Sequence, residues 1–419
     1  MAEAYIIDAV RTPRSIGKMG KGALSTMHPE HVSASVLAAL AERNNLNTAD
    51  VDDVIWGVSG AMGLQSGDIG RNAALDAGYD PKAGGVTLNR FCGSSITATN
   101  FAAGMIMAGM HDLAISGGMD MMSYVMYYGA KMREAGLGGA GMGAGNPRLQ
   151  AKHPQSNQGV CADAIAAMEG ITRAELEALG LESQRRAAIA IAEGRFAKST
   201  IVVKDDDGNV VLDHEEYPRP DTTAEGLAQL KPAFEMFLDM PSAEGGKTYR
   251  QLINQVYPDV DIKPIHHVGI SSGVVDGAAA VLLASKEYAE KHGLKPRARI
   301  VAMTEIGDCP TLMLNAPVPA AKKVLAKAGL TVADIDVFEV NEAFAVVVEK
   351  FIRDLGVDRA KVNPNGGSIA LGHPIAGTGA ILIGTALDEL ERTGGRYALI
   401  TMCAAGGMAP AIIIERIAG

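Results

Sequence analysis

One cysteine stands where an apolar run ends and a run of small residues begins. Cys92 lies in Asn89-Arg90-Phe91-Cys92-Gly93-Ser94-Ser95-Ile96, which predicts the end of a strand followed by the start of a helix. A thiol at a helix amino terminus meets the positive end of the helix dipole and free backbone N–H groups. Both favour the thiolate and lower its pKa, so the pattern is typical of a nucleophile. The alternative interpretation is a buried structural thiol.

Three more polar residues follow predicted strands in the second half of the chain. His373, in the turn Gly372-His373-Pro374, is of the residue type that usually serves as base for a cysteine nucleophile. Cys403 lies in a turn of small residues whose backbone amides suit an oxyanion hole. Asn341 opens the run Asn341-Glu342-Ala343-Phe344 and can orient a water or an oxyanion. Taken singly, they are also compatible with a loop histidine, a core thiol and a helix-capping asparagine.

The other cysteines and one histidine pair are weaker candidates. Cys161 lies in a predicted helix, and we expect a core thiol there. Cys309 has no glycine-rich turn around it and no obvious base. The pair His266-His267 lacks a second ligand cluster at metal spacing, so we predict no metal site.

The elements that position these residues recur along the chain. Three pairs of segments match in the same order at nearly one offset: 46–52 with 330–336, 86–89 with 362–365, and 113–119 with 398–408. The repetition predicts a duplicated α/β domain, with helices at 96–108 and 376–389 packed on mostly parallel strands. Pseudo-twofold packing of the two halves would bring Cys92 and His373 to one crevice at the strand ends.

A long excursion separates the halves. It includes a Gly-, Ala- and Met-rich stretch at 129–146, a charged helical stretch at 172–196 and Asp-rich turns at 205–208, and it closes near residue 270. Long insertions of this kind are usually lids or binding loops, so we expect 129–270 to form one covering unit that is mobile at 136–146. The lone GxGxxG at 136–141 follows no strand, which argues against a dinucleotide site.

Composition limits the class of protein. The 419 residues suit two or three domains, and no stretch approaches the roughly 20 apolar residues of a membrane span. A net charge of −10 with interspersed signs makes a nucleic-acid partner unexpected. Four cysteines without a CxxC pair are no disulfide framework. The first residues resemble a strand and no signal peptide, so we expect a cytoplasmic location.

Taken together, these motifs resemble the thiolase family. The resemblance rests on the runs around Cys92, Asn341, His373 and Cys403 in this order, and it extends along nearly the whole chain through 116–119 and 272–279. It implies a five-layered αβαβα fold with an inserted loop domain, and a homodimer or homotetramer. The implied division is 1–120 with 270–294, then 121–269, then 295–419.

The resemblance also implies roles. Cys92 would take the acyl group, His373 would activate its thiol, and Cys403 would move the proton at the substrate α-carbon or leaving group. Asn341 and His373 match one oxyanion site. The resemblance implies a second oxyanion site at the amides of Cys92 and of the Ala405-Gly406 turn. It also implies that Arg219 and Ser272 contact coenzyme A. Acyl-CoA and coenzyme A are then substrates, and no covalently bound cofactor is expected.

Several positions depart from the family pattern. Ala404-Ala405 stand where many members have glycine, Asn157 and Gln158 stand where histidine and methionine are frequent, and residues 266–270 replace a Thr-Ala-Gly-Asn run. They surround the pocket and leave the catalytic residues intact. The alternatives are a β-ketoacyl synthase, against which the second thiol Cys403 argues, and a non-catalytic acyl-CoA binder, against which the complete set of catalytic residues argues.

Overall fold

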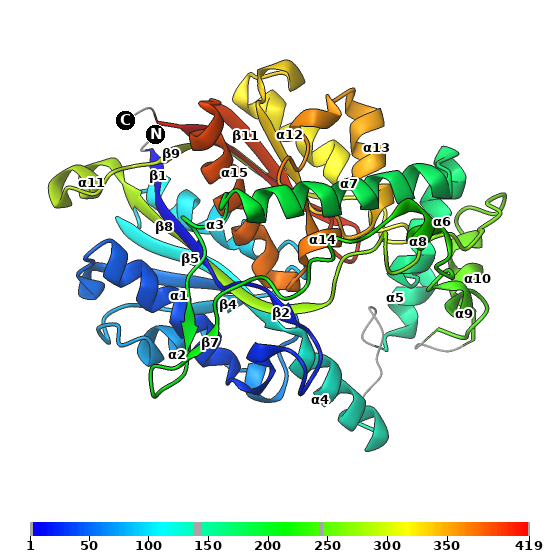
Figure 1. The fold of residues 1–419 in the computed structure, drawn as a ribbon, viewed down its shortest axis with the longest axis horizontal. Helices are drawn as coiled ribbons and strands as arrows, with labels where there is room; N and C mark the ends of the chain where they lie inside the picture. Colours follow the sequence, from blue (N-terminus) through cyan, green and yellow to red (C-terminus); the bar gives the residue numbers. More distant parts are fainter. Residues whose placement is uncertain (1–2, 138–144, 243–245, 418–419) are drawn as a thin grey trace.

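One mixed β-sheet runs through the molecule (Figure 1). The computed structural model describes residues 3–137, 145–242 and 246–417. Within them the strands follow one another in the order β10 (Val337–Val340), β11 (Tyr397–Thr401), β12 (Met408–Arg416), β9 (Ala298–Gly307), β1 (Ala4–Arg11), β8 (Val275–Ser285), β5 (Leu113–Met121), β3 (Asp53–Gly57) and β4 (Val86–Leu88). The short β2 (Ser15–Ile16) pairs with β8 off this path.

The strand order is symmetric about the β1–β9 junction. The short helices η2 (Thr48–Asp50) and η4 (Val332–Asp334) lead into β3 and β10, which lie parallel to β5 and β11. Val86 pairs with β3 and Val362 bridges β10, each in a parallel sense. The predicted internal duplication is therefore confirmed in the strand arrangement.

The expectation of mostly parallel strands is wrong. Pairs β1–β8, β1–β9, β5–β8, β9–β12 and β11–β12 are all antiparallel. A tight turn at 402–407 joins β11 to β12, and such a short connection can join only antiparallel neighbours. The connection from β5 to β8 spans about 150 residues, so the direction in which β8 returns is not encoded in a local pattern.

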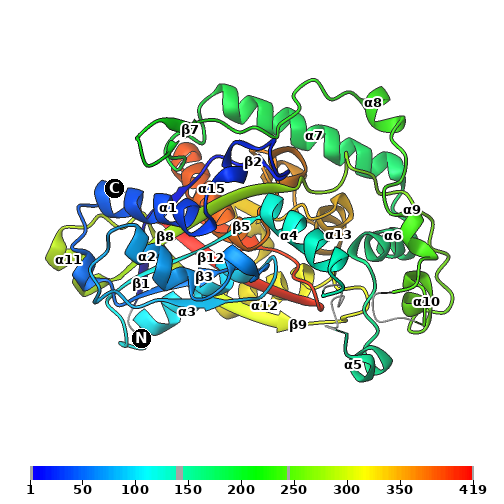
Figure 2. The same cartoon turned by 90° about the horizontal axis from the view of Figure 1, so that it is seen from below.

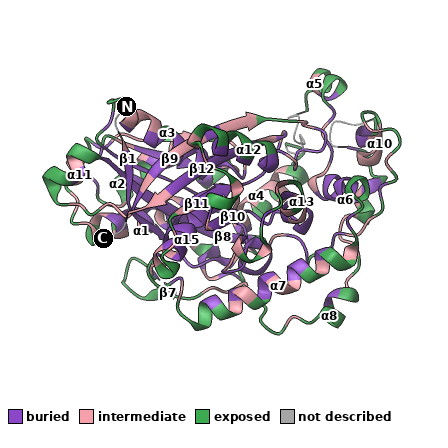
Figure 3. Ribbon diagram, turned by 90° about the horizontal axis from the view of Figure 1, so that it is seen from above, coloured by how far each residue is buried: buried purple, intermediate pink, exposed green. Residues whose placement is uncertain are grey.

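Two helices lie between the two halves of the sheet. α3 (Ser94–Met107) and α15 (Thr378–Thr393) contact each other, and each also contacts strands of both halves. Both are buried over most of their circumference, as helices of small and apolar residues can be (Figure 3). α1 (Pro29–Arg43) and α2 (Ile69–Asp76) cover the first half, and α12 (Pro317–Ala328), with α13 (Ala345–Leu355) beside it, covers the second. The layers are thus helix, sheet, helix, sheet, helix.

The segment between β5 and β8 contributes no strand to this sheet within its described residues. It contains α4 (Met122–Glu134), α5 (Pro147–Lys152), α6 (Gln158–Glu169), α7 (Arg173–Ala192), the hairpin β6 (Val203–Lys204) and β7 (Val210–Leu212), α8 (Ala224–Ala228), α9 (Glu235–Leu238) and α10 (Tyr249–Asn254). In Figure 2, α7 runs along one side of the molecule, while α6, α9 and α10 gather at one end. The predicted boundaries 121–269 and 270–294 stay a prediction.

The helical stretch predicted at 172–196 is confirmed as α7, which begins at a capping box formed by Thr172 and Glu175. Residues 129–134, the start of the Gly-, Ala- and Met-rich stretch, belong to α4. Most of the GxGxxG run and of the predicted mobile stretch 136–146 lies outside the described residues. Over the described ranges, we find no helix long and apolar enough to cross a membrane.

Candidate active site

Cys92 lies at the start of α3, between the two halves. It follows Phe91, whose φ of +50° is unusual for a residue with a side chain, and precedes the helix cap Gly93. A Cβ on Gly93 would lie 2.8 Å from Pro410 Cδ and 3.5 Å from Ala404 Cβ. The loop of Cys92 in the first half therefore packs directly on the turn that follows Cys403 in the second.

That turn is the tight connection from β11 to β12. Ala404 and Met408 exchange backbone hydrogen bonds of 2.7 and 3.1 Å. The left-handed backbone falls on Gly406 and Gly407, with φ of +79° and +77°, and Ala405 is not among the residues with positive φ. The alanines at 404 and 405 are thus compatible with the turn, because its strained positions keep their glycines.

The pKa of Cys92 is raised in the structure, whereas its place at a helix start predicted a lowered pKa. Burial raises the pKa of Cys92 well above its usual range, and the nearby Cys403 and Asp120 raise it further. Burial likewise raises the pKa of Cys403 to about 12. The predicted low pKa of Cys92 is therefore wrong, because removing the thiolate from water outweighs the helix amides. Both thiols are neutral at rest.

His373 is also neutral, because burial lowers its pKa to about 3. Asn341 Nδ2 lies 3.4 Å from His373 Nε2, and His373 Nδ1 lies 2.5 Å from Thr378 Oγ1. Ser368 Oγ donates to Asn341 Oδ1 at 2.6 Å, which turns the amide nitrogen of Asn341 toward the imidazole. Since an amide nitrogen can only donate, His373 Nε2 must be the proton-accepting nitrogen and Nδ1 carries the hydrogen.

The first helical turns of α3 and α15 hold the two loops together. The N–H of Ala380 donates to Ser95 Oγ at 2.9 Å, and a Cβ on Gly379 would lie 2.7 Å from the Ile96 nitrogen. The amino termini of these helices therefore meet where Cys92 and His373 precede them. The helix packing therefore places the loops that carry Cys92 and His373 on the same side of the α3–α15 contact, and a direct contact between the two side chains stays a prediction.

Ser272 belongs to a segment that is hydrogen-bonded to the loop after Asn341 and to the loop that carries His373. Its N–H donates to the carbonyl of Ala343 at 3.0 Å. Next to it, Gly273 donates to the Ser368 carbonyl at 3.0 Å and accepts from the N–H of His373 at 2.8 Å. The segment thus fixes the backbone on either side of the Asn341–His373 contact.

Arg219 lines a cavity of about 250 Å³. The cavity is also lined by Gln184 of α7, by Tyr217, and by Val268, Gly269 and Ile369. Ile369 is in α14 (Ser368–Leu371), one residue beyond the Asn341 partner Ser368. The Arg219 guanidinium carbon lies 5.8 Å from the centre of the Tyr217 ring. The cavity therefore extends from a cationic side chain toward the histidine loop.

A buried ion-pair cluster anchors the chain just before Arg219. Glu215 accepts from Arg11 at 2.6 Å and from the Arg14 side chain at 2.9 and 3.0 Å. Burial acts to raise the pKa of Glu215, but Arg11 and Arg14 override it and lower the pKa to about 2. Glu216 accepts from Ser15 Oγ and the Ile16 N–H. We call this set of residues the 215–216 clasp.

The weaker candidates take structural places. Cys161 is buried and its thiol bonds the Thr311 carbonyl at 3.2 Å, which confirms a core thiol. His266 pairs with Asp163 at 2.7 Å and His267 with Glu177 at 3.0 Å. No group of three His, Cys, Asp or Glu among the described residues could hold a metal ion.

Two buried carboxyl groups were not predicted from the sequence. Glu342 accepts from Ser183 Oγ at 2.7 Å, from Asn363 and from the Ile369 N–H, so it ties α7 to the loop before His373. Asp120, at the end of β5, accepts from the N–H of Ala376 at 2.8 Å. For Asp120 the available signal is an acidic residue within an otherwise apolar strand.

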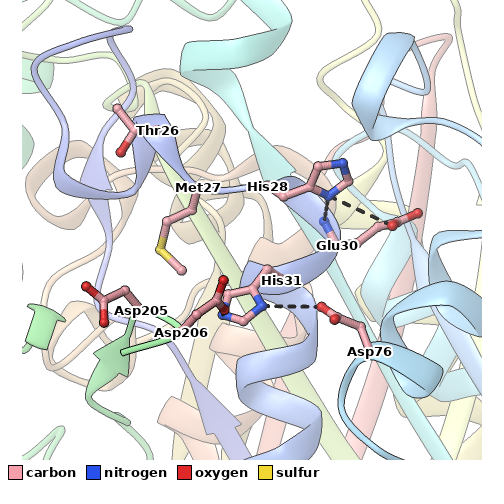
Figure 4. A pocket seen from close by; sticks show the side chains of 8 residues that line it. All are labelled: Thr26, Met27, His28, Glu30, His31, Asp76, Asp205 and Asp206. Carbon is pink, nitrogen blue, oxygen red and sulfur yellow. Dashed lines mark hydrogen bonds and ion pairs between the residues drawn. The ribbon is translucent and has the colours of Figure 1, made fainter. Parts of the chain in front are cut away.

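A larger cavity of about 500 Å³ lies elsewhere (Figure 4). It is lined by Thr26, Met27, His28, Glu30, His31, Asp76, Asp205 and Asp206. In Figure 4 the His31 ring is directed toward Asp76, at 3.3 Å. None of the candidate residues contributes to this cavity.

The fold and two matches to known domains define an enzyme that transfers acyl groups. Residues 4–237 match the family described as "Thiolase, N-terminal domain", and residues 294–416 match "Thiolase, C-terminal domain". The chain therefore belongs to the thiolase family, and it is an acyltransferase of the acetyl-CoA C-acyltransferase type.

Similar proteins cover the whole chain. A beta-ketoadipyl-CoA thiolase of Acinetobacter baylyi is 41% identical, and the match covers 100% of both chains. A steroid 3-ketoacyl-CoA thiolase of Mycobacterium tuberculosis is 40% identical over 100% of this chain and 95% of its own. A 3-oxoadipyl-CoA/3-oxo-5,6-dehydrosuberyl-CoA thiolase of Escherichia coli is 40% identical over 100% of both. These relatives support thiolase activity.

Proposed function

We propose that Cys92 carries the acyl group in this thiolase and that His373 removes its proton. The observation that carries the proposal is the hydrogen-bonded set Ser368–Asn341–His373–Thr378, which leaves Nε2 of a neutral imidazole as the basic nitrogen. Because thiol and imidazole are both neutral at rest, the proton moves to His373 as sulfur attacks the thioester carbonyl. The S–acyl bond forms and coenzyme A leaves with a proton.

Cys403 completes the carbon-centred step in this proposal. In cleavage, Cys92 attacks the ketone of the 3-ketoacyl group, the bond between C2 and C3 breaks, C2 receives a proton from Cys403, and acetyl-CoA leaves. Coenzyme A then gives its thiol proton to Cys403 and takes the acyl group, and Cys92 regains its proton from His373. Condensation runs the same steps backwards. Asn341 is one donor proposed for the first oxyanion, and His373 becomes the second once Nε2 carries the proton taken from Cys92. The amides of Cys92 and of the Ala405-Gly406 turn are proposed for the other oxyanion.

Arg219 and Ser272 are proposed to hold coenzyme A. Arg219 lines the cavity that reaches toward the histidine loop, and its guanidinium suits a phosphate. Ser272 lies on the segment that joins this region to His373. No covalently bound cofactor is required by the proposed steps, since acyl-CoA and coenzyme A supply all the atoms exchanged.

The substrate is proposed to be a 3-ketoacyl-CoA with an acyl part larger than acetoacetyl. The support is the names of the relatives, which specify beta-ketoadipyl, 3-oxoadipyl and steroid 3-ketoacyl thioesters. The polar Asn157 and Gln158 at the start of α6 are compatible with an acyl group that carries polar atoms. The kcat/KM for 3-oxoadipyl-CoA should exceed that for acetoacetyl-CoA at least tenfold. The reverse ranking would refute this part.

We also propose a cytoplasmic homodimer or homotetramer. The edge strand β4 leaves one side unpaired and exposes Val86, which suits pairing between subunits. All four cysteines are free thiols, as is typical of a reducing compartment. Light scattering and cell fractionation would check both statements.

Incubation with acetyl-CoA tests the mechanism. Intact-mass and peptide mass spectrometry should find one acetyl group, located on Cys92, together with an equivalent of free coenzyme A. An acetyl group on another residue, or no covalent adduct, would contradict the proposed nucleophile.

A further inference from the structure

Asp120 is a buried acid that sits where the two halves meet. It lies near the end of β5 in the first half and has no exposed surface. Its side chain reaches η6 (Ile375–Gly377), which begins two residues after His373. The backbones here touch, since a Cβ on Gly118 would lie 2.6 Å from the Ala376 carbonyl oxygen.

All hydrogen bonds to the Asp120 carboxyl group are donated to it. Ser59 Oγ and Gln65 Nε2 donate at 2.6 Å each, the Ala376 N–H at 2.8 Å and the Gly60 N–H at 3.2 Å. The Ser59 N–H lies 3.3 Å from both oxygens. A carboxyl group that only accepts is best served by its ionised form. Burial raises its pKa to about 6, and these donors work against that rise.

The loop that Asp120 holds is strained. Ile375, between His373-Pro374 and the bonded Ala376, has φ of +21°, which a β-branched residue rarely adopts. Such a conformation persists only where the surroundings fix it. The Asp120–Ala376 bond is a direct anchor from the first half onto this loop. Loss of the bond would let the loop relax and shift the imidazole.

The same anion acts on the nucleophile. Ser59, which donates to Asp120, accepts from Asn89 Nδ2 at 3.2 Å through its carbonyl, and Asn89 lies three residues before Cys92. Burial raises the pKa of Cys92, and the charges of Cys403 and Asp120 raise it further. A fixed negative charge near the thiol disfavours ionisation of Cys92 in the resting enzyme. The same charge opposes proton transfer from Cys92 to His373 much less, because the total charge of the Cys92–His373 pair does not change in that step.

We propose that Asp120 is a positioning residue for acyl transfer, which fixes the histidine loop against the nucleophile and holds a negative charge beside Cys92. The inference rests on the proposed roles of Cys92 and His373. It is separable from them, because it concerns how fast and how selectively Cys92 reacts and not whether it reacts.

Asp276 provides a matched control. It lies on β8, pairs in register with Met121 beside Asp120, and is fully buried. It accepts from the N–H and Oγ of Ser123 at 2.8 and 2.6 Å, and burial raises its pKa to about 6. Ser123, its partner in both bonds, lies in α4 and not in the histidine loop.

The experiment compares Asp120→Asn with Asp276→Asn in the full-length enzyme. Two rates are measured: alkylation of Cys92 by iodoacetamide at pH 8, followed by peptide mass spectrometry, and the burst of free coenzyme A after mixing with acetyl-CoA. Asp120→Asn should alkylate about three- to tenfold faster, since it loses the charge that opposes the thiolate. Its acylation burst should be at least tenfold slower. Asp276→Asn should change neither rate more than twofold, even where it lowers the melting temperature as much as Asp120→Asn does.

Ser59→Ala serves if Asp120→Asn does not fold. It removes one donor that keeps Asp120 ionised, so Cys92 should alkylate faster at pH 7, by about twofold. Unchanged rates in a folded Asp120→Asn variant would overturn the inference. If only Ser59→Ala folds, unchanged rates in that variant would do so. Equal changes of rate in Asp276→Asn would also overturn it. If wild-type Cys92 is not acylated at all, the proposed function fails instead.

Discussion

The backbone N–H of His373 donates to the carbonyl of Gly273 at 2.8 Å. Gly273 lies under the Tyr217 ring, since a Cβ there would come within 2.2 Å of it. Tyr217 follows the 215–216 clasp and lines the cavity of Arg219. The proposed coenzyme A site and the proposed base are therefore joined by one glycine.

Gly273→Ala should impair turnover without unfolding the enzyme. The added methyl group must displace either Tyr217 or the backbone that bonds His373. A misplacement of this kind typically costs about 10- to 100-fold in kcat/KM. Tyr217→Ala combined with Gly273→Ala makes room for the methyl group and should recover part of the loss.

Steady-state kinetics of both variants and of Gly104→Ala would check this. Gly104 is in α3, and a Cβ there meets nothing within 4 Å, so that variant should behave like the wild type. Full activity of Gly273→Ala would show that the Gly273–His373 contact does not position the imidazole.

Cys92→Ala should abolish acyl transfer and covalent labelling. Removing a covalent nucleophile usually lowers the rate by several orders of magnitude. Circular dichroism must first show a folded protein. Acetyl-enzyme formed by that folded variant would assign the acyl group to another residue.

Cys403→Ser should separate the two half-reactions. Cys92 should still be acylated by acetyl-CoA, because that step needs only His373 and the oxyanion donors. Cleavage of 3-ketoacyl-CoA and exchange of the α-protons of acetyl-CoA with deuterium oxide should fall by at least about 100-fold. Normal cleavage by this variant would make Cys403 structural and would favour a synthase-like site.

Glu215→Gln should destabilise the enzyme in a pH-dependent way. The pKa of Glu215 is about 2 in the folded chain and about 4.3 in an unfolded one, so its contribution is complete above about pH 5 and is lost as the pH falls toward 2. Each pKa unit corresponds to about 1.4 kcal/mol, so the loss at pH 7 is about 3 kcal/mol.

Urea unfolding of both proteins between pH 3 and pH 7 measures that difference. The gap in unfolding free energy should shrink as the pH falls. Glu193→Gln removes an exposed carboxylate from its ion pair with the half-buried Arg195, which also bonds Asn365, so it should change stability by less than about 1 kcal/mol. A constant gap for Glu215→Gln would mean that its ionisation does not stabilise the clasp.

Local patterns predicted the duplicated strands and the helix starts that follow Cys92 and His373, whereas the joint action of Cys92, Cys403 and His373 stays a prediction. Those features depend on strand ends and helix starts, which short runs encode. Strand direction was predicted wrongly because β8 returns after a long insertion. The pKa of Cys92 was predicted wrongly because a helix start is visible in a short run, whereas the packing of the neighbouring Gly93 on Ala404 and Pro410 depends on the other half of the chain.

The contacts of Asp120 and of the 215–216 clasp were not predicted from the sequence, for a related reason. An acid is recognisable as a carboxylate with many partners only when residues distant in sequence are placed around it. Ala376 is 256 residues from Asp120, and Arg14 is 201 residues from Glu215.

The neutral resting state of the two buried thiols bears on how long the enzyme survives oxidants. Peroxide attacks thiolates and hardly reacts with thiols, and it must reach the sulfur. An idle enzyme is thus shielded from sulfenic acid formation at both cysteines. Damage should accumulate with turnover and not with age, because only a working site exposes sulfur in its ionised form.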